Sequence, residues 1–133
     1  MLVSIGVAFL ASLIFLQLLW FCIERFRNRK AKAKVGVIYL RGMIVGDEAL
    51  GAAPDLISFD VVKQKLNGID TQNLAALIIN ISSPGGLPVQ TDRISTFLKA
   101  RFANIPIICF IEEMAASGGY WLACTAQEIY ATR

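Results

Sequence analysis

Beyond residue 34, short apolar runs alternate with longer segments in which apolar residues recur at helical spacing. Residues 35–40, 74–81 and 106–111 are predicted strands, and a further strand is predicted to begin at Glu128. The runs at 74–81 and 106–111 are almost continuously apolar, which is typical of strands buried on both faces of a parallel sheet. The alternation predicts an α/β layer with right-handed crossovers.

Three helices are expected between these strands. Ser58 is predicted to cap a helix that runs to Leu66 and ends at Asn67-Gly68. Residues 88–103 carry one apolar stripe, and residues 115–126 are predicted to be helical. Residues 41–57 contain three glycines and a proline and are predicted to form a loop. The apolar stripe of 88–103 consists of Ile94, Phe97, Leu98 and Phe102.

The N-terminal residues 1–23 contain no charged side chain. As a helix they would extend about 34 Å, enough to cross a hydrocarbon core of about 30 Å. Trp20 and Phe21 lie at one end, where aromatic side chains favour the membrane interface. A cleavable signal peptide would have basic residues before the apolar run and a small-x-small site after it. The reverse order here predicts an uncleaved transmembrane anchor over 1–23.

The net charge of +3 is unevenly distributed. Residues 24–34 hold six basic residues and one acidic residue, whereas residues 35–133 hold seven basic and nine acidic residues. A basic cluster beside an apolar segment is a topology signal, so 24–34 is predicted to be a juxtamembrane linker on the cytoplasmic side. Because the folded part is slightly acidic, no nucleic-acid partner is expected.

The chain contains three cysteines and no histidine. Cys22, Cys109 and Cys124 form no CxxC pair and are expected to be buried free thiols. Without histidine, neither a Ser-His-Asp nor a Cys-His site can form within these residues. We expect no metal and no cofactor.

The first candidate site segment is Ser82-Ser-Pro-Gly-Gly86, directly after the apolar run 74–81. Adjacent glycines permit positive φ and leave backbone N–H groups free to point outward. A turn at the carboxyl end of a parallel strand is where α/β folds bind ligands. The alternative interpretation is an ordinary turn between strand and helix. The segment lacks the GxxxxGK[ST] pattern of a nucleotide-binding loop.

The second candidate segment is residues 113–123, EMAASGGYWLA, directly after the apolar run 106–111. Small residues flank Ser117, so its hydroxyl can approach a substrate backbone closely. A helix that begins near Ser117 would direct its first N–H groups toward a developing oxyanion. The alternative is a serine that caps a small-residue helix. Because the two segments follow successive strands, they should lie together at one edge of the sheet, a geometry suited to acyl transfer.

Three runs resemble the signal peptide peptidase A family of membrane serine peptidases, including its SohB-like branch. These runs are VIYLRG, LIINISSPGG and IPIICFIEEMAASGGYWLACTAQEIYA. The resemblance implies an incomplete Clp protease/crotonase-like α/β fold over 35–133 and a Ser-Lys dyad that cleaves peptides such as signal-peptide remnants. Ser117 matches the nucleophile, and Gly86 matches an oxyanion-hole donor. Gly118 is the expected second donor because it follows the nucleophile.

The family's general-base lysine has no counterpart in these residues. The chain's lysines match no family position and are expected to be surface charges: Lys30, Lys32, Lys34, Lys63, Lys65 and Lys99. We therefore expect 35–133 to be the N-terminal part of a peptidase domain whose lysine lies beyond Arg133. Ser82 also departs from the family, which often has asparagine there.

The resemblance further implies a single-pass protein of the cytoplasmic (inner) membrane that contacts lipid, acts on peptide or protein substrates and forms homo-oligomers at full length. The side of the membrane stays open, because the family often acts on the outer side. Two other functions also stay open. One is a non-catalytic family member that serves as a membrane scaffold or interaction protein. The other is an acyl-thioester-binding protein of the crotonase fold.

Overall fold

The computed structural model describes residues 14, 16–21, 23–24, 34–49 and 55–132. The chain divides into two units, Met1–Lys32 and Ala33–Arg133. In the first unit the described residues are helical. Most of the predicted anchor 1–23 and of the linker 24–34 lies outside the described residues. Within the described residues, no helix combines the length and apolar character needed to cross a membrane.

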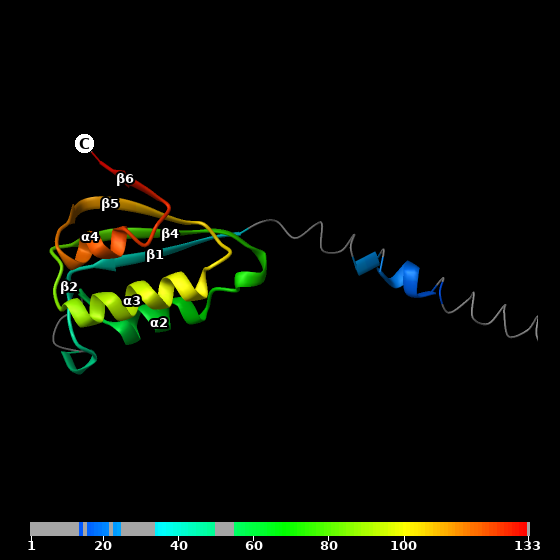
Figure 1. Ribbon diagram of the computed structural model, residues 1–133, viewed down its shortest axis with the longest axis horizontal. Helices are drawn as coiled ribbons and strands as arrows, with labels where there is room; N and C mark the ends of the chain where they lie inside the picture. The colour runs from blue at the N-terminus through cyan, green and yellow to red at the C-terminus, as the bar shows by residue number, and fades with distance from the viewer. Residues whose placement is uncertain (1–13, 15, 22, 25–33, 50–54, 133) are drawn as a thin grey trace, which may run out of the picture. The chain divides into compact units, whose positions relative to one another are not determined.

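A four-stranded parallel sheet is the centre of the second unit (Figure 1). Its strands are β1 (Lys34–Arg41), β4 (Leu74–Ser83), β5 (Ile107–Ala115) and β6 (Glu128–Ala131), in that spatial order. Each neighbouring pair is parallel. The predicted α/β architecture with a parallel sheet is therefore confirmed, and the four expected strands all form.

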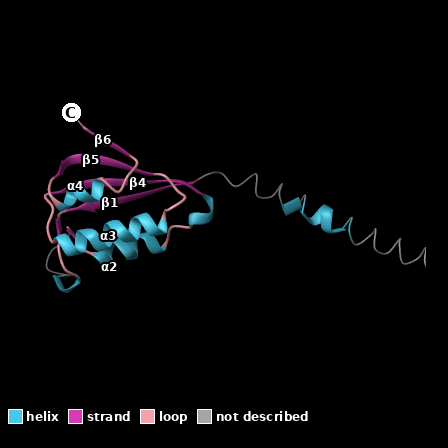
Figure 2. Cartoon of the chain, viewed as in Figure 1, coloured by secondary structure: helices cyan, strands magenta, loops and turns pink. Residues whose placement is uncertain are grey.

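Helices α2 (Phe59–Asn67) and α3 (Pro88–Arg101) lie side by side along one side of the strands (Figure 2). Ser58 caps α2 as expected, since its hydroxyl accepts a hydrogen bond of 3.3 Å from Val61 N–H, and Gly68 ends the helix. Proline occupies the first turn of α3, where its missing N–H has no intrahelical role.

The third helix is shorter than predicted. The sequence predicts a helix over 115–126, but α4 spans only Gly118–Ala123. β5 continues through Ala115, and Ser117 has φ 50°, which a right-handed helix cannot include. The small residues that favour a helix here also allow the extended strand and the tight turn.

The hydrophobic core lies between the three helices and one face of the sheet. Residues that share a row across the strands point to that face, for example Ile38, Ile79 and Cys109. Their helical partners include Leu66 of α2, Leu98 of α3 and Leu122 of α4, all fully buried. The predicted stripe of α3 faces this core, with Ile94, Leu98 and Phe102 buried and Phe97 packed against them.

The opposite face of the sheet differs from the prediction. We expected β4 and β5 to be buried on both faces, but Ile78 and Ile108 are only half-buried and Phe110 is exposed. Val37 and Tyr39 of β1 are exposed on the same face. A continuous apolar run indicates that both faces of a strand carry apolar side chains. It does not indicate whether a helix or another element packs on each face.

The segment predicted as a loop holds two short strands. β2 (Met43–Ile44) and β3 (Leu56–Ile57) pair in parallel with each other, and Ile44 also bridges to Gly86. Two short 3-10 helices complete the described elements, η1 (Asp47–Ala49) and η2 (Thr71–Asn73). Strands of two residues are too short to produce an alternating pattern, which is why the sequence shows only a loop.

Candidate active site

The glycine turn begins where β4 ends. Ser83 closes the strand, Pro84 follows, and Gly85 and Gly86 have φ values of 99° and 154°. A Cβ on Gly86 would lie 2.0 Å from the carbonyl oxygen of Ile44, so a side chain cannot be accommodated there. Both positive φ and close approach therefore require glycine at Gly86.

Ser117 lies in the turn between β5 and α4. Its φ of 50° and ψ of −121° make it the one non-glycine residue with positive φ in the described part of the chain. Strained backbone of this kind costs about 1–3 kcal/mol and clusters at functional sites. Ser117 is exposed, and its hydroxyl makes no capping hydrogen bond to α4.

The two turns pack directly against each other. A Cβ on Gly85 would lie 2.8 Å from Ser117 Cβ and 2.8 Å from the backbone nitrogen of Gly118. The backbone N–H of Ala116 donates a hydrogen bond of 3.0 Å to the carbonyl oxygen of Ser83. The order of the strands thus brings together the two segments that the sequence singled out.

Two backbone N–H groups beside Ser117 are unused. A Cβ on Gly118 would lie 3.5 Å from the backbone nitrogen of Gly86, so these two residues are close neighbours. Among the described residues, neither the Gly86 N–H nor the Gly118 N–H donates to a protein acceptor. Free N–H groups next to a serine can bind an oxyanion.

No lysine is placed beside Ser117 as a general base within the described residues. Lys65 Nζ donates 2.8 Å to the carbonyl oxygen of Tyr39, and Lys34, Lys63 and Lys99 are exposed on other elements. Lys30 and Lys32 lie outside the described residues. The four described lysines therefore do not contact the hydroxyl that a base would have to deprotonate.

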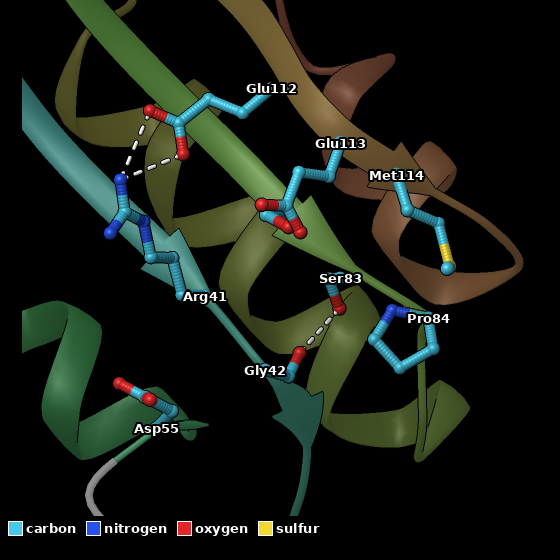
Figure 3. Close-up of a pocket in the computed structure, with 9 residues that line it drawn as sticks. Arg41, Gly42, Asp55, Ser83, Pro84, Glu112, Glu113 and Met114 are labelled. Carbon is cyan, nitrogen blue, oxygen red and sulfur yellow. Dashed lines mark hydrogen bonds and ion pairs between the residues drawn. The ribbon is translucent and has the colours of Figure 1, made fainter.

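A cleft of about 410 Å³ opens at the carboxyl edge of the sheet, beside the glycine turn (Figure 3). Arg41 spans it with two hydrogen bonds to the Glu112 carboxylate, at 2.8 and 3.0 Å. Asp55 and Glu113 add two further carboxylates. The lining residues are Arg41, Gly42, Asp55, Ser82, Ser83, Pro84, Glu112, Glu113 and Met114.

Sequence reasoning did not identify the charged residues of this cleft. Arg41 and Glu112 are 71 positions apart and resemble ordinary surface charges. In the structure, Arg41 lies opposite Ser82 in the β1–β4 register, directly before the glycine turn. Without a known register that relationship cannot be extracted from the sequence.

The described cysteines are free thiols. Burial raises the pKa of the Cys109 thiol to about 11, with a smaller contribution from Cys124, so this thiol stays protonated at neutral pH. Cys124 is exposed, which contradicts its expected burial. Within the described residues, no group of three or more His, Cys, Asp or Glu side chains could hold a metal ion.

Known proteins are similar to parts of this chain. Residues 99–133, which include Ser117, match the family model for peptidase family S49. The chain is 28% identical over 115 residues to Protease 4 of Haemophilus influenzae and 36% identical over 62 residues to the chloroplastic serine protease SPPA of Arabidopsis thaliana. It is also 32% identical over 108 residues to a Brucella melitensis protein named Na(+)/H(+) antiporter NhaA.

These matches cover 81%, 47% and 79% of the chain, in that order, but only 17%, 9% and 14% of the relatives. The chain thus spans less than a fifth of the length of these curated relatives. The parallel α/β fold and the matches define the chain as a homologue of serine peptidases. The family to which these matches point is peptidase family S49, the family of signal peptide peptidase A and protease IV.

Proposed function

We propose that these residues form part of a membrane-anchored serine endopeptidase in which Ser117 is the nucleophile. The observation that carries the proposal is the contact between the Ser117 turn and the Gly85-Gly86 turn, with two free N–H groups beside the serine. Homology to serine peptidases over the segment that contains Ser117 supports it.

In the proposed reaction, Ser117 Oγ attacks the carbonyl carbon of a peptide bond while a base removes its proton. The carbonyl oxygen becomes an oxyanion and accepts hydrogen bonds from the N–H groups of Gly86 and Gly118. The base then gives the proton to the leaving amine as the C–N bond breaks, which leaves an acyl ester on Ser117. Water hydrolyses that ester by the same steps.

The base is proposed to be a lysine from a part of the whole protein other than the described residues. It must be neutral to accept the proton, which requires burial or a nearby positive charge to lower its pKa. The four described lysines do not fit this role, because all four are exposed and Lys65 is also bonded to the Tyr39 carbonyl oxygen.

The proposed substrates are peptides such as signal-peptide remnants, and the proposed location is the cytoplasmic membrane, with one anchor over 1–23. The apolar segment and the family resemblance support both. We propose no transport function, because the family model that matches residues 99–133 is that of a peptidase family.

The test uses the whole protein and a fluorophosphonate probe, which reacts covalently with activated serines. We expect labelling and peptide hydrolysis in the natural protein and neither in Ser117→Ala, because only Ser117 supplies the attacking oxygen. Ser58→Ala is a matched control, since it removes a buried serine hydroxyl at the start of α2. Peptide hydrolysis that survives in Ser117→Ala would disprove this role.

A non-catalytic scaffold is the second candidate. The observation that favours it is that Ser117 Oγ has no hydrogen-bond partner within the described residues. If the whole protein is folded and no serine is labelled, this candidate replaces the peptidase.

A further inference from the structure

Ser83 is a fully buried polar residue at the junction of three segments. Its hydroxyl donates a hydrogen bond of 2.6 Å to the carbonyl oxygen of Gly42, as the dashed line in Figure 3 shows, and accepts one of 3.1 Å from the Gly85 N–H. Its own carbonyl oxygen accepts from Ala116, next to the nucleophile. Ser83 therefore bonds to three segments: Gly42, which links β1 to β2 and is called the Gly42 loop, the glycine turn at Gly85-Gly86, and the turn that contains Ser117.

Hydrogen bonds are what hold the glycine turn in place. Gly85 has φ 99°, and glycine moves between backbone conformations at little cost because it lacks a Cβ. The Gly85 carbonyl accepts 2.9 Å from the Ile44 N–H, whereas the one acceptor for the Gly85 N–H among the described residues is Ser83 Oγ. Without that oxygen, a buried N–H would lack an acceptor, and the turn would move to satisfy it.

The Gly42 loop is a firm anchor for this hydroxyl. Gly42 has φ 91°, and a Cβ there would lie 1.9 Å from the carbonyl oxygen of Asp55. Its N–H donates 2.9 Å to the Ser82 carbonyl oxygen. The Gly42 carbonyl, which accepts from the Ser83 hydroxyl, is therefore held by close packing of Gly42 against the Asp55 backbone and by the hydrogen bond to Ser82.

We infer that Ser83 is a positioning residue, whose hydroxyl holds the glycine turn, and with it the Gly86 N–H, in place beside the Ser117 turn. This inference rests on the proposed function and assigns a role to a residue that touches neither the substrate nor the reacting atoms. The Ser83 hydroxyl acts on the glycine turn through the Gly85 N–H, and the Ser83 backbone carbonyl holds the Ser117 turn through the Ala116 N–H. Ser83 couples the oxyanion donor to the nucleophile.

The test compares labelling kinetics of the whole protein with those of Ser83→Ala over a range of fluorophosphonate concentrations. The dependence on concentration separates the binding constant KI from the reaction rate constant kinact. We expect kinact of Ser83→Ala to fall about 10-fold or more, because a displaced oxyanion donor slows reaction strongly. KI should not change, because Ser83 does not contact the probe.

Ser58→Ala is the matched control for general loosening of the fold. Both serines are fully buried, and both lose a bonded hydroxyl on replacement by alanine. We expect kinact and KI of Ser58→Ala to equal those of the natural protein. If Ser83→Ala does not fold, Ser83→Cys keeps a weak donor and a similar volume, and its kinact should still fall.

The outcomes separate the two claims. If Ser117 of the natural protein is not labelled, the proposed peptidase function fails. If Ser117 is labelled and folded Ser83→Ala or Ser83→Cys reacts with unchanged kinact, the positioning role is overturned while the peptidase function stands. An equal fall in kinact for Ser58→Ala would also overturn the positioning role.

Discussion

The turn at Ser117 shows how single residues determine the geometry of the site. Its backbone conformation is costly for a residue with a side chain, so neighbouring bonds must hold it. The N–H of Gly119 donates 2.8 Å to the Ala116 carbonyl, and the N–H of Trp121 donates 3.1 Å to the Ser117 carbonyl. The first turn of α4 therefore stabilises the strained residue.

Gly86→Ala should destabilise the protein by about 2 kcal/mol or more, since it combines an unfavourable φ with a clash against the backbone of Ile44. Gly68→Ala is the matched control, because Gly68 has φ −83° and open space around its Cα. We expect Gly68→Ala to be neutral or to stabilise by about 0.4–1 kcal/mol. Chemical denaturation measures both, and equal free energies of unfolding would contradict the predicted clash.

Helix α2 shows how one element depends on two side-chain caps. Ser58 accepts from the Val61 N–H, and Asp47 Oδ1 accepts 3.0 Å from the Asp60 N–H. Asp47 also forms an ion pair of 3.2 Å with Arg93 of α3. The Asp60 N–H, Ser58 and Arg93 together lower the pKa of Asp47 below its ordinary value of 3.8, despite partial burial.

Asp47 should therefore make stability pH-dependent in acid. A lowered pKa in the folded state means that the stabilisation is present above the unfolded pKa, near 3.8, and is lost as pH falls through the folded pKa. Asp47→Asn should be less stable near neutral pH and lose less stability between pH 5 and 2. Thermal unfolding of both proteins across that range measures it, and parallel pH profiles would refute the role of Asp47.

Elements could be predicted from the sequence where one buried face makes apolar residues recur at regular spacing. The caps of α2 were predicted from a serine and a glycine at its two ends, Ser58 and Gly68. The apolar stripe of α3 was predicted from apolar residues that recur at helical spacing. β2 and β3 were missed because two residues cannot show a period. The length of α4 was overestimated because the φ of Ser117 depends on packing against the glycine turn, which lies far away in sequence.

At the scale of the whole molecule, the candidate site could be predicted only in part. The order of the strands predicted that the turns at Gly86 and Ser117 would meet, and they do. The cleft charges Arg41 and Glu112 could not be foreseen, since their meeting depends on register across three strands. The roles of Ser117, Gly86 and Gly118 remain predictions until they are tested kinetically.

Attachment to the membrane is a prediction for the whole protein. With residues 1–23 present, we expect the protein to stay in the membrane fraction after a high-salt and carbonate wash, since an apolar helix of that length resists extraction. Deletion of 1–23 should release it. Replacement of the six basic residues in 24–34 by glutamine is the control for surface binding and should leave it membrane-bound. Extraction of the natural protein by the wash would contradict the anchor.

The two turns of the site meet so closely that a Cβ on Gly85 would lie 2.8 Å from the Ala116 carbonyl oxygen, the Gly118 nitrogen and Ser117 Cβ. The charged side chains of the cleft instead belong to Arg41, Asp55, Glu112 and Glu113. The tight turns thus hold the geometry around Ser117, whereas these charged side chains set the charge of the neighbouring cleft. If the proposed function holds, an engineer could exchange the charged cleft side chains to test which peptides are accepted, whereas the glycines leave almost no freedom for redesign.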